Sequence, residues 1–293
     1  MNEINEVLRQ SNIKPLGYIK CGNTVRIKTN STDYIVKKNN IDKRILEYLS
    51  NCNFKEYPDT IYSKKYIISK YEIDSNIPSE KKMFDLIDTI SNLHSKTSFY
   101  KEASSYEYKT IYEDIINDLD DLNEYYNNYI NIIDEKELYS PSEFLLSTNI
   151  SYIFKSLYNS RKYIDEWYKK IENLDKIRVS VIHNNLDLSH FIRNKKNFLI
   201  SFDKSKIDMP IYDLYNLYNK YYMDYNFSEL LKRYDKIYPL KDYEKELFLV
   251  LINIPKKIVY TNEYDTCINI SYEIDRLYKS NELKNSLKER VLP

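Results

Sequence analysis

The chain has 293 residues, enough to bury a sizeable core in one domain or in two lobes. Its 44 basic and 44 acidic residues give a formal net charge of zero, which argues against nucleic acid or an anionic membrane as a general electrostatic partner. Tyrosine is extreme at 32 residues and glycine is rare at 2, a bias that suits an AT-rich coding sequence and also a Tyr-rich interaction surface.

Cysteine usage and the hydropathy of the chain indicate the compartment. Cys21, Cys52 and Cys267 are widely spaced and form no metal-binding pattern, as expected in a reducing environment. The first ten residues are polar and of mixed charge, unlike a signal peptide. No apolar run approaches the roughly 18 residues of a membrane span. We therefore expect a cytoplasmic protein.

The N-terminal quarter of the chain predicts a small antiparallel sheet. Residues 1–10 show the apolar spacing of a short amphipathic helix, and residues 41–49 that of a second helix. Between and after them, short β-branched and aromatic runs are separated by turn residues. The expected strands are 18–20, 24–28, 34–37, 61–62 and 66–71.

Most of the remaining chain is predicted to be helical, because apolar residues recur at helical spacing. Ser140-Pro141-Ser142-Glu143 has the pattern of a capping box with proline at the first helical position. The expected helices are 83–94, 111–129, 140–174, 211–236, 241–253 and 261–280.

In one stretch, residues 181–218, the sequence predicts short strands and polar loops followed by a helix. A β-branched strand ends at Val181 and Ile182, and a polar loop follows. A second strand starts at Phe191, and a third is expected over 198–202. Pro210 then precedes a helix.

The spacing in this stretch is specific. His183-x-Asn185 is followed by His190 five residues on, then by Ser201 at a strand end and by Asp208-x-Pro210-x-x-Asp213-Leu214. This spacing resembles the catalytic core of protein-kinase-like phosphotransferases, in particular the aminoglycoside-phosphotransferase branch and its spore-coat kinases of endospore-forming bacteria.

The resemblance implies an α+β, bilobal protein-kinase-like fold. Residues 1–75 would form a small N-terminal lobe, an antiparallel sheet with one helix, and residues 76–293 a large, mostly helical C-terminal lobe. Lys37, with Ile35 on the same strand face, would be the phosphate-binding lysine, unless the register places Lys38 inward. Glu47 would be its ion-pair partner.

The resemblance also implies a nucleotide contact between the lobes. The run Tyr71-Glu72-Ile73-Asp74 falls where the linker is expected, so the backbone of Glu72 and Ile73 would hydrogen-bond adenine. His183 and Asp213 would be structural: His183 would pack under the catalytic loop, and Asp213 would accept hydrogen bonds from the loop backbone.

Three chemical positions of the motif are substituted. Asn185 stands where the family has its proton-accepting Asp, and an amide offers no comparable base. His190 and Ser201 stand at the two metal positions. An imidazole suits zinc or copper better than magnesium, and a neutral hydroxyl is a weak substitute for a carboxylate.

Two nearby carboxylates are possible substitutes. Asp187 lies two residues past Asn185 and could replace it as the base. Asp203 lies two residues past Ser201, on the same expected strand face, and could replace it as a metal ligand. Each would need a backbone shift of about 6 Å, at the roughly 3.3 Å rise per residue of a strand.

These substitutions favour a catalytically impaired pseudokinase. It would be a scaffold related to spore-coat kinases and would need no cofactor. Its partner would be a spore-coat or morphogenetic protein, and it would be deposited on the forespore surface or coat. The alternative is an active ATP-dependent small-molecule or sugar phosphotransferase that uses ATP and magnesium in a rearranged site. The sequence leaves the oligomeric state open.

Overall fold

The computed structural model describes residues 2–63, 65–75, 77–102 and 105–288. The chain separates into two compact units. One unit holds the residues up to Ser98 together with Ser180–Asp213 and Lys236–Tyr238, and the other holds the rest. Residue 76, the expected start of the large lobe, lies outside the described residues. The lobe boundary between residues 75 and 76 stays a prediction.

The first unit contains the five-stranded antiparallel sheet that the sequence predicted, with strand order β1-β2-β3-β5-β4. A positive φ of 57° at Gly22 makes the tight turn between the first two strands, a conformation that glycine adopts without strain. The helices and strands of this part are α1 (Asn2–Gln10), β1 (Gly17–Cys21), β2 (Thr24–Lys28), β3 (Tyr34–Lys38), α2 (Lys43–Asn51), β4 (Thr60–Tyr62) and β5 (Tyr66–Lys70).

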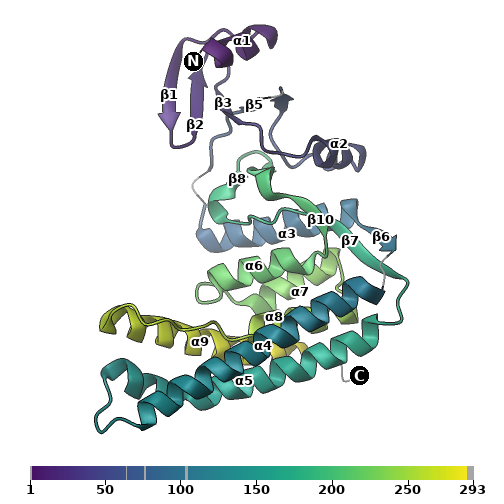
Figure 1. Cartoon of the computed structure of the whole chain (residues 1–293). Helices are drawn as coiled ribbons and strands as arrows, with labels where there is room; N and C mark the ends of the chain where they lie inside the picture. The colour runs from purple at the N-terminus through teal and green to yellow at the C-terminus, as the bar shows by residue number, and fades with distance from the viewer. Residues whose placement is uncertain (1, 64, 76, 103–104, 289–293) are drawn as a thin grey trace. The chain divides into compact units, whose positions relative to one another are not determined.

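The two faces of this sheet differ because strand side chains alternate. One face packs against α1 in an apolar cluster that includes Leu8, Ile27, Val36 and Ile68. Figure 1 labels α1 beside the β1–β2 hairpin. The opposite face carries the neighbours of Val36 in β3, which are half-buried rather than part of that cluster. The sheet therefore leaves one face for a site.

The remainder of the first unit surrounds the loop that follows residue 182. The end of β7 pairs antiparallel with β10, and β8 pairs with β9. The prediction of a strand over 198–202 is wrong in extent, because β9 ends at Leu199. The elements are α3 (Ser79–Thr97), the end of β7 (Lys176–Ile182), β8 (Phe191–Arg193), β9 (Asn197–Leu199), β10 (Lys206–Asp208) and the start of α6 (Ile211–Tyr221).

The second unit is built mainly from helices. The long helices α4 and α5 lie side by side (Figure 1), and α5 also packs against α8 and α9. Ser140 and Glu143 form the predicted capping box at the start of α5. The elements are β6 (Phe99–Glu102), α4 (Ser105–Asp134), α5 (Pro141–Ile171), the rest of α6, α7 (Phe227–Ile237), α8 (Asp242–Asn253) and α9 (Glu263–Lys288).

The helix predicted over residues 211–236 is instead two helices, α6 and α7. The Oδ1 atom of Asn226 accepts a hydrogen bond of 3.1 Å from the backbone N–H of Ser228. An asparagine just before a helix satisfies amides that the first turn leaves free. This local cap explains why the chain restarts a helix where the apolar spacing alone continues.

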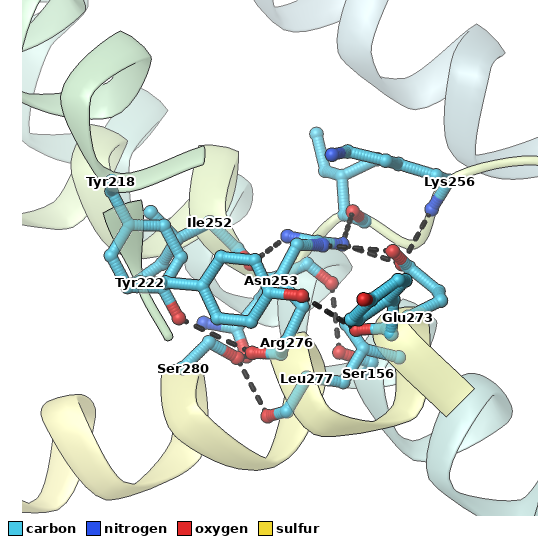
Figure 2. Close-up of polar contacts among 12 residues, drawn as sticks. Ser156, Tyr218, Tyr222, Ile252, Asn253, Lys256, Glu273, Arg276, Leu277 and Ser280 are labelled. Atoms are coloured by element: carbon cyan, nitrogen blue, oxygen red, sulfur yellow. Dashed lines mark hydrogen bonds and ion pairs between the residues drawn. The ribbon is translucent and has the colours of Figure 1, made fainter. Parts of the chain in front are cut away.

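A buried ion pair closes the C-terminal end of α8 (Figure 2). The guanidinium of Arg276 donates to the backbone oxygens of Ile252 (2.6 Å) and Ile254 (2.7 Å), which the helix leaves unpaired. Its other N–H groups bind Glu273, and that carboxylate also accepts from the backbone N–H of Lys256. Burial opposes the charged form, but the hydrogen bonds to Glu273 prevail and raise the pKa of Arg276.

Candidate functional site

A fully buried carboxylate anchors the loop after β7. Asp213 lies in the first turn of α6, and its two oxygens accept hydrogen bonds of 2.7 Å each from the backbone N–H groups of His183 and Asn184. The ring Nε2 of His94, on α3, lies 3.2 Å from the same carboxylate. A carboxylate at a helix start is also favoured by the helix dipole. Asp213 thus occupies the geometry that the resemblance implied for it.

Two histidine rings are held by backbone carbonyls. His183 Nε2 lies 2.8 Å from the oxygen of Ile200, and its ring packs edge-on against Phe202 with centroids 4.9 Å apart. His190 Nδ1 lies 2.8 Å from the oxygen of Asn185. Burial lowers the pKa of His183, so this ring is held in its neutral form. Its Nδ1 atom is buried with no hydrogen-bond partner among the described residues.

In the loop between these histidines, the carboxylate of Asp187 caps a short turn. Asp187 precedes a single 3-10 turn, Leu188–His190, and its Oδ1 accepts a 2.6 Å hydrogen bond from the backbone N–H of Ser189. This is the role of an N-cap. Asn185 contributes its backbone oxygen to the contact with His190 described above. Local hydrogen bonds therefore fix the shape of this loop.

The chain reverses direction at Ser201, which has a left-handed backbone with φ 68° and ψ 48°. This conformation costs a residue with a Cβ roughly 1 to 2 kcal/mol. A 3-10 turn, Phe202–Lys204, follows at once. The prediction that Ser201 and Asp203 share a strand face is therefore wrong, because no strand extends past Leu199 here.

This turn brings Asp203 to Lys37. The Nζ atom of Lys37 donates to both carboxylate oxygens of Asp203, at 2.8 and 2.9 Å. The two side chains are 20% and 31% exposed, so the pair is shielded but not dry. An ion pair across 166 positions of sequence joins the two segments that the resemblance singled out.

Lys37 is the inward lysine of β3. It lies opposite Ile67 in β5 and lines a cavity of about 260 Å³, which we call the Lys37 cavity. Lys38 is exposed. The walls are contributed by one face of the sheet, the segment before β4 and the turn after β9, and include Ile35, Tyr57, Tyr62, Ile67, Tyr71, Glu72, Leu199 and Phe202.

The structure does not bring Glu47 to Lys37. Glu47 is 59% exposed on α2, and its carboxylate pairs with Lys43 one turn earlier, at 3.1 Å. The buried face of this helix consists of Ile45, Leu46 and Leu49, so residue 47 points outward. The expectation of a Lys37–Glu47 pair is therefore wrong, and Asp203 provides the partner carboxylate.

The two residues expected to contact adenine are placed differently from each other. Glu72 lines the Lys37 cavity, 3.8 Å from Lys70 and 3.3 Å from the side-chain amide of Asn194. Ile73 is 67% exposed and is not among the residues that line the cavity. The nucleotide role of both residues remains a prediction.

Several aromatic walls of the cavity were missed in the sequence analysis. Tyr57 lies in an irregular segment, for which no periodicity predicts an inward side. Thr60 and Tyr62 alternate with the more exposed Ile61 in β4, the reverse of the usual apolar-inward pattern. The pairing of β4 with β5 is what places Tyr62 beside Ile67.

The side chains at the two expected metal positions, His190 and Ser201, and the nearby Asp203 do not fit a magnesium ion. Magnesium prefers oxygen ligands in octahedral geometry, usually with one or two carboxylates. Here the ring of His190 offers nitrogen, Ser201 offers a hydroxyl, and the carboxylate of Asp203 is already shared by Lys37. Within the described ranges, no group of three His, Cys, Asp or Glu side chains is suited to hold a metal ion.

No protein-family model matches the chain, and no curated protein matches it in sequence. Among solved structures, the aminoglycoside phosphotransferase from Alicyclobacillus acidocaldarius is similar over 94% of this chain and 92% of that chain, with a TM-score of 0.70 at 11% identity. The chain has the fold of the aminoglycoside phosphotransferases. The AMP-bound spectinomycin phosphotransferase is similar over 100% of this chain and 95% of that chain, with a TM-score of 0.52 at 13% identity.

These similarities establish the α+β kinase-like fold that the spacing of residues 181–214 predicted. In the part of the chain that the structure describes, no helix combines the length and the apolar character of a membrane span.

Proposed function

We propose that this chain is a pseudokinase, a phosphotransferase-fold protein that does not transfer phosphate and acts by binding another protein. One observation carries the proposal. Between Val181 and Asp203 the acidic residues are Asp187 and Asp203, and both carboxylates already have partners. Asp187 caps the turn at Ser189, and Asp203 is held by Lys37 through both oxygens.

Phosphoryl transfer needs a carboxylate that accepts the hydroxyl proton and metal ions that neutralise the phosphates. Asn185 has no basic site at the first position. Removing a general base typically slows a reaction by about 10² to 10⁴. The side chains of His190, Ser201 and Asp203 do not fit magnesium, as described above. The fold is therefore retained without the groups that the chemistry requires.

The test is restoration of the three substituted positions. Wild-type protein should show no magnesium-dependent ATP consumption with sugar, amino-sugar or protein acceptors. The triple variant Asn185→Asp, His190→Asn, Ser201→Asp should bind magnesium–ATP more tightly than wild type. The control variant Asn127→Asp, Asn131→Asp adds the same two carboxylates at exposed positions of α4 and should not. Robust wild-type transfer would overturn the proposal.

The binding role is supported by an exposed apolar cluster at the α4–α5 turn. Leu138, Tyr139 and Phe144 are 87%, 41% and 61% exposed, and they line a surface hollow with Pro141. Large exposed apolar side chains that gather in one place are typical of protein-binding surfaces. We propose a spore-coat or morphogenetic protein as the partner, met in the cytoplasm of a sporulating cell and at the forespore surface or coat.

Affinity capture from sporulating cells tests this role. Wild-type protein should recover coat or morphogenetic proteins, and Leu138→Ser, Phe144→Ser should lose them. Tyr264→Ser, which removes an equally exposed aromatic ring on α9, should retain them. Recovery of nothing above background, or equal recovery by the double variant, would contradict the proposed binding surface.

A second candidate function is an active ATP-dependent small-molecule or sugar phosphotransferase with a rearranged site. It is favoured by the position of the Asp203 carboxylate, 2.8 Å from the cavity lysine, where a carboxylate could serve a nucleotide once the pair opens. Its signature would be magnesium-dependent transfer that Asp203→Ala or Asp187→Ala abolishes.

A further inference from the structure

Charge is distributed unevenly along this neutral chain. Residues 110–154, which include most of α4, the turn after it and the first half of α5, contain ten acidic residues and one basic residue, Lys136. That lysine is already paired with Glu143. The rest of the chain carries the compensating positive charge. The exposed apolar cluster at the α4–α5 turn therefore lies in a strongly acidic segment, and charge complementarity restricts the partners that it can accept.

One exposed face of α4 carries a row of these carboxylates, which we call the acidic row. Asp114, Asp118 and Asp121 follow i, i+4, i+7 spacing, so they lie on the same side of the helix, and all three are exposed. Among the described residues, none of these three carboxylates has an ion-pair partner. Like charges at this spacing destabilise a helix, so the row lowers the stability of the unbound protein.

The same face of α4 leads to the apolar cluster. Ile132 comes about five helical turns after Asp114, so its side chain returns to the side of the acidic row, and it is 57% exposed. Leu138 and Phe144, 87% and 61% exposed, follow in the turn and at the start of α5. The surface thus has an apolar end and an acidic stripe, which together extend over about 30 Å at the 1.5 Å rise per residue of a helix.

The turn that presents the apolar end is fixed by contacts within this unit, in addition to the capping box described above. The Tyr139 hydroxyl donates to the Asp134 carboxylate at 3.3 Å. The backbone N–H of Ser142 donates to the Glu263 carboxylate of α9 at 2.5 Å. Because the turn is already ordered, a partner would lose little affinity to ordering it.

We propose that the α4–α5 hairpin docks a basic amphipathic helix of a partner protein. Apolar side chains at one end of that helix would fill the hollow at the turn, and its lysine or arginine residues would lie along the acidic row. This inference rests on the proposed function, because it names the chemistry of the partner that the apolar cluster would bind. Carboxylates at helical spacing match positive charges at the same spacing on a helix that lies alongside, as they do between paired helices. An acidic segment would be repelled, so the row also selects against wrong partners.

Binding of two synthetic peptides tests the inference. Both have about 20 residues, a length that spans about 30 Å as a helix. One repeats lysine at i, i+4 and i+7 and carries leucine and phenylalanine at one end, and the other scrambles the same residues. Fluorescence anisotropy should show that wild-type protein binds the first peptide about tenfold or more tightly than the second. Binding of neither peptide, or equal affinity for both, would overturn the inference.

The triple variant Asp114→Asn, Asp118→Asn, Asp121→Asn isolates the acidic row. Because it removes like-charge repulsion, the variant should keep its circular dichroism spectrum. At low salt it should bind the helical peptide about tenfold more weakly than wild type, chiefly through slower association. The difference should shrink toward about 1 M salt, where the Debye length is about 3 Å.

A matched control removes three exposed carboxylates from α8 and α9, through Asp242→Asn, Asp275→Asn and Glu282→Gln. It should bind the helical peptide as wild type does. Equal weakening would show that only net charge matters and would overturn the inference. Association of the protein with itself, detected by sedimentation and abolished in the acidic-row variant, would assign the surface to a second copy and would overturn it too.

The apolar end has its own variant, and the result separates this inference from the proposed function. Leu138→Ser, Phe144→Ser should abolish binding of the helical peptide. Capture of coat or morphogenetic proteins that depends on Leu138 and Phe144 but not on the acidic row would remove the inference and leave the proposed function standing. Magnesium-dependent transfer by wild-type protein would remove the proposed function itself.

Discussion

Two ion pairs, one in each compact unit, use the same charges for different purposes. Arg276 and Glu273 are 2% and 5% exposed, and the surrounding backbone groups satisfy the remaining donors and acceptors. Lys37 and Asp203 are 20% and 31% exposed and face a cavity. Arg276 also donates to backbone oxygens that the end of α8 leaves unpaired. Among the described residues, the Lys37 ammonium donates to the carboxylate of Asp203 and to no backbone group.

The comparison shows that burial and backbone partners, rather than the charges, decide what a pair does. A buried pair with additional hydrogen bonds is costly to break, because the partner left behind is an uncompensated charge. A partly exposed pair regains water when it opens, so it contributes little to stability. We therefore read Arg276–Glu273 as structural, and Lys37–Asp203 as a pair that sets the charge of its cavity.

The largest effect is expected at Arg276. Arg276→Met leaves the Glu273 carboxylate buried without its cation and leaves the backbone oxygens of Ile252 and Ile254, at the end of α8, without their donor. It should therefore lower the free energy of unfolding by about 3 to 5 kcal/mol. Arg161→Met, which removes an exposed arginine paired with Asp120, should cost under about 1 kcal/mol. Urea denaturation measures both, and equal losses would break the contrast.

The next effect is expected at Asp213. Asp213→Ala leaves two buried backbone N–H groups, those of His183 and Asn184, without an acceptor and should destabilise by about 1 to 3 kcal/mol. Asp213→Asn keeps one acceptor oxygen and should lose less. Chemical denaturation of both variants checks this order, and an unaffected Asp213→Ala variant would show that the loop has another anchor.

A pH effect is expected from His183. Because burial lowers its pKa in the folded state, the unfolded chain binds a proton first as the pH falls below about 6.5. The stability from the neutral ring is full above that pH and is lost as the pH falls to the folded pKa, at up to about 1.4 kcal/mol per unit. His183→Gln should reduce the change in the free energy of unfolding between pH 7.5 and pH 5, measured by urea denaturation. An unchanged pH dependence would show that another group causes it.

The smallest effect is expected at Lys37 and Asp203. A double-mutant cycle with Lys37→Met and Asp203→Asn should give a coupling free energy of about 1 kcal/mol or less. The same cycle on the exposed pair Lys43–Glu47 sets the baseline, at roughly 0.3 to 0.5 kcal/mol for a helical pair. A coupling of several kcal/mol at Lys37 would make the pair structural, like that of Arg276.

Strand alternation and helical spacing predicted much of the fold. The inward position of Lys37 followed from its strand phase, and the capping box at Ser140 was readable from four residues. The link from Asp213 to His183, 30 positions apart, came from the resemblance alone, because no local pattern encodes it. The helical phase of Ile45, Leu46 and Leu49 already placed Glu47 outward, a signal that the sequence analysis passed over.

The partner of Lys37 could not be predicted from sequence. It depends on the left-handed backbone of Ser201, which residues with a Cβ rarely adopt and which no side-chain pattern marks. That single residue ends the strand early and turns Asp203 toward the sheet. The tyrosines that line the cavity could not be predicted either, because the 32 tyrosines are spread over the whole chain and nothing in the sequence distinguishes these few.

The most direct test of the central claim is calorimetric titration of wild-type protein with ATP, with and without magnesium. Because Asp203 is held by Lys37 and the other donors do not suit magnesium, the account predicts that the metal leaves the ATP affinity unchanged and that no ADP forms during the titration. Magnesium that tightens ATP tenfold or more, with ADP released in proportion to protein and time, would contradict it.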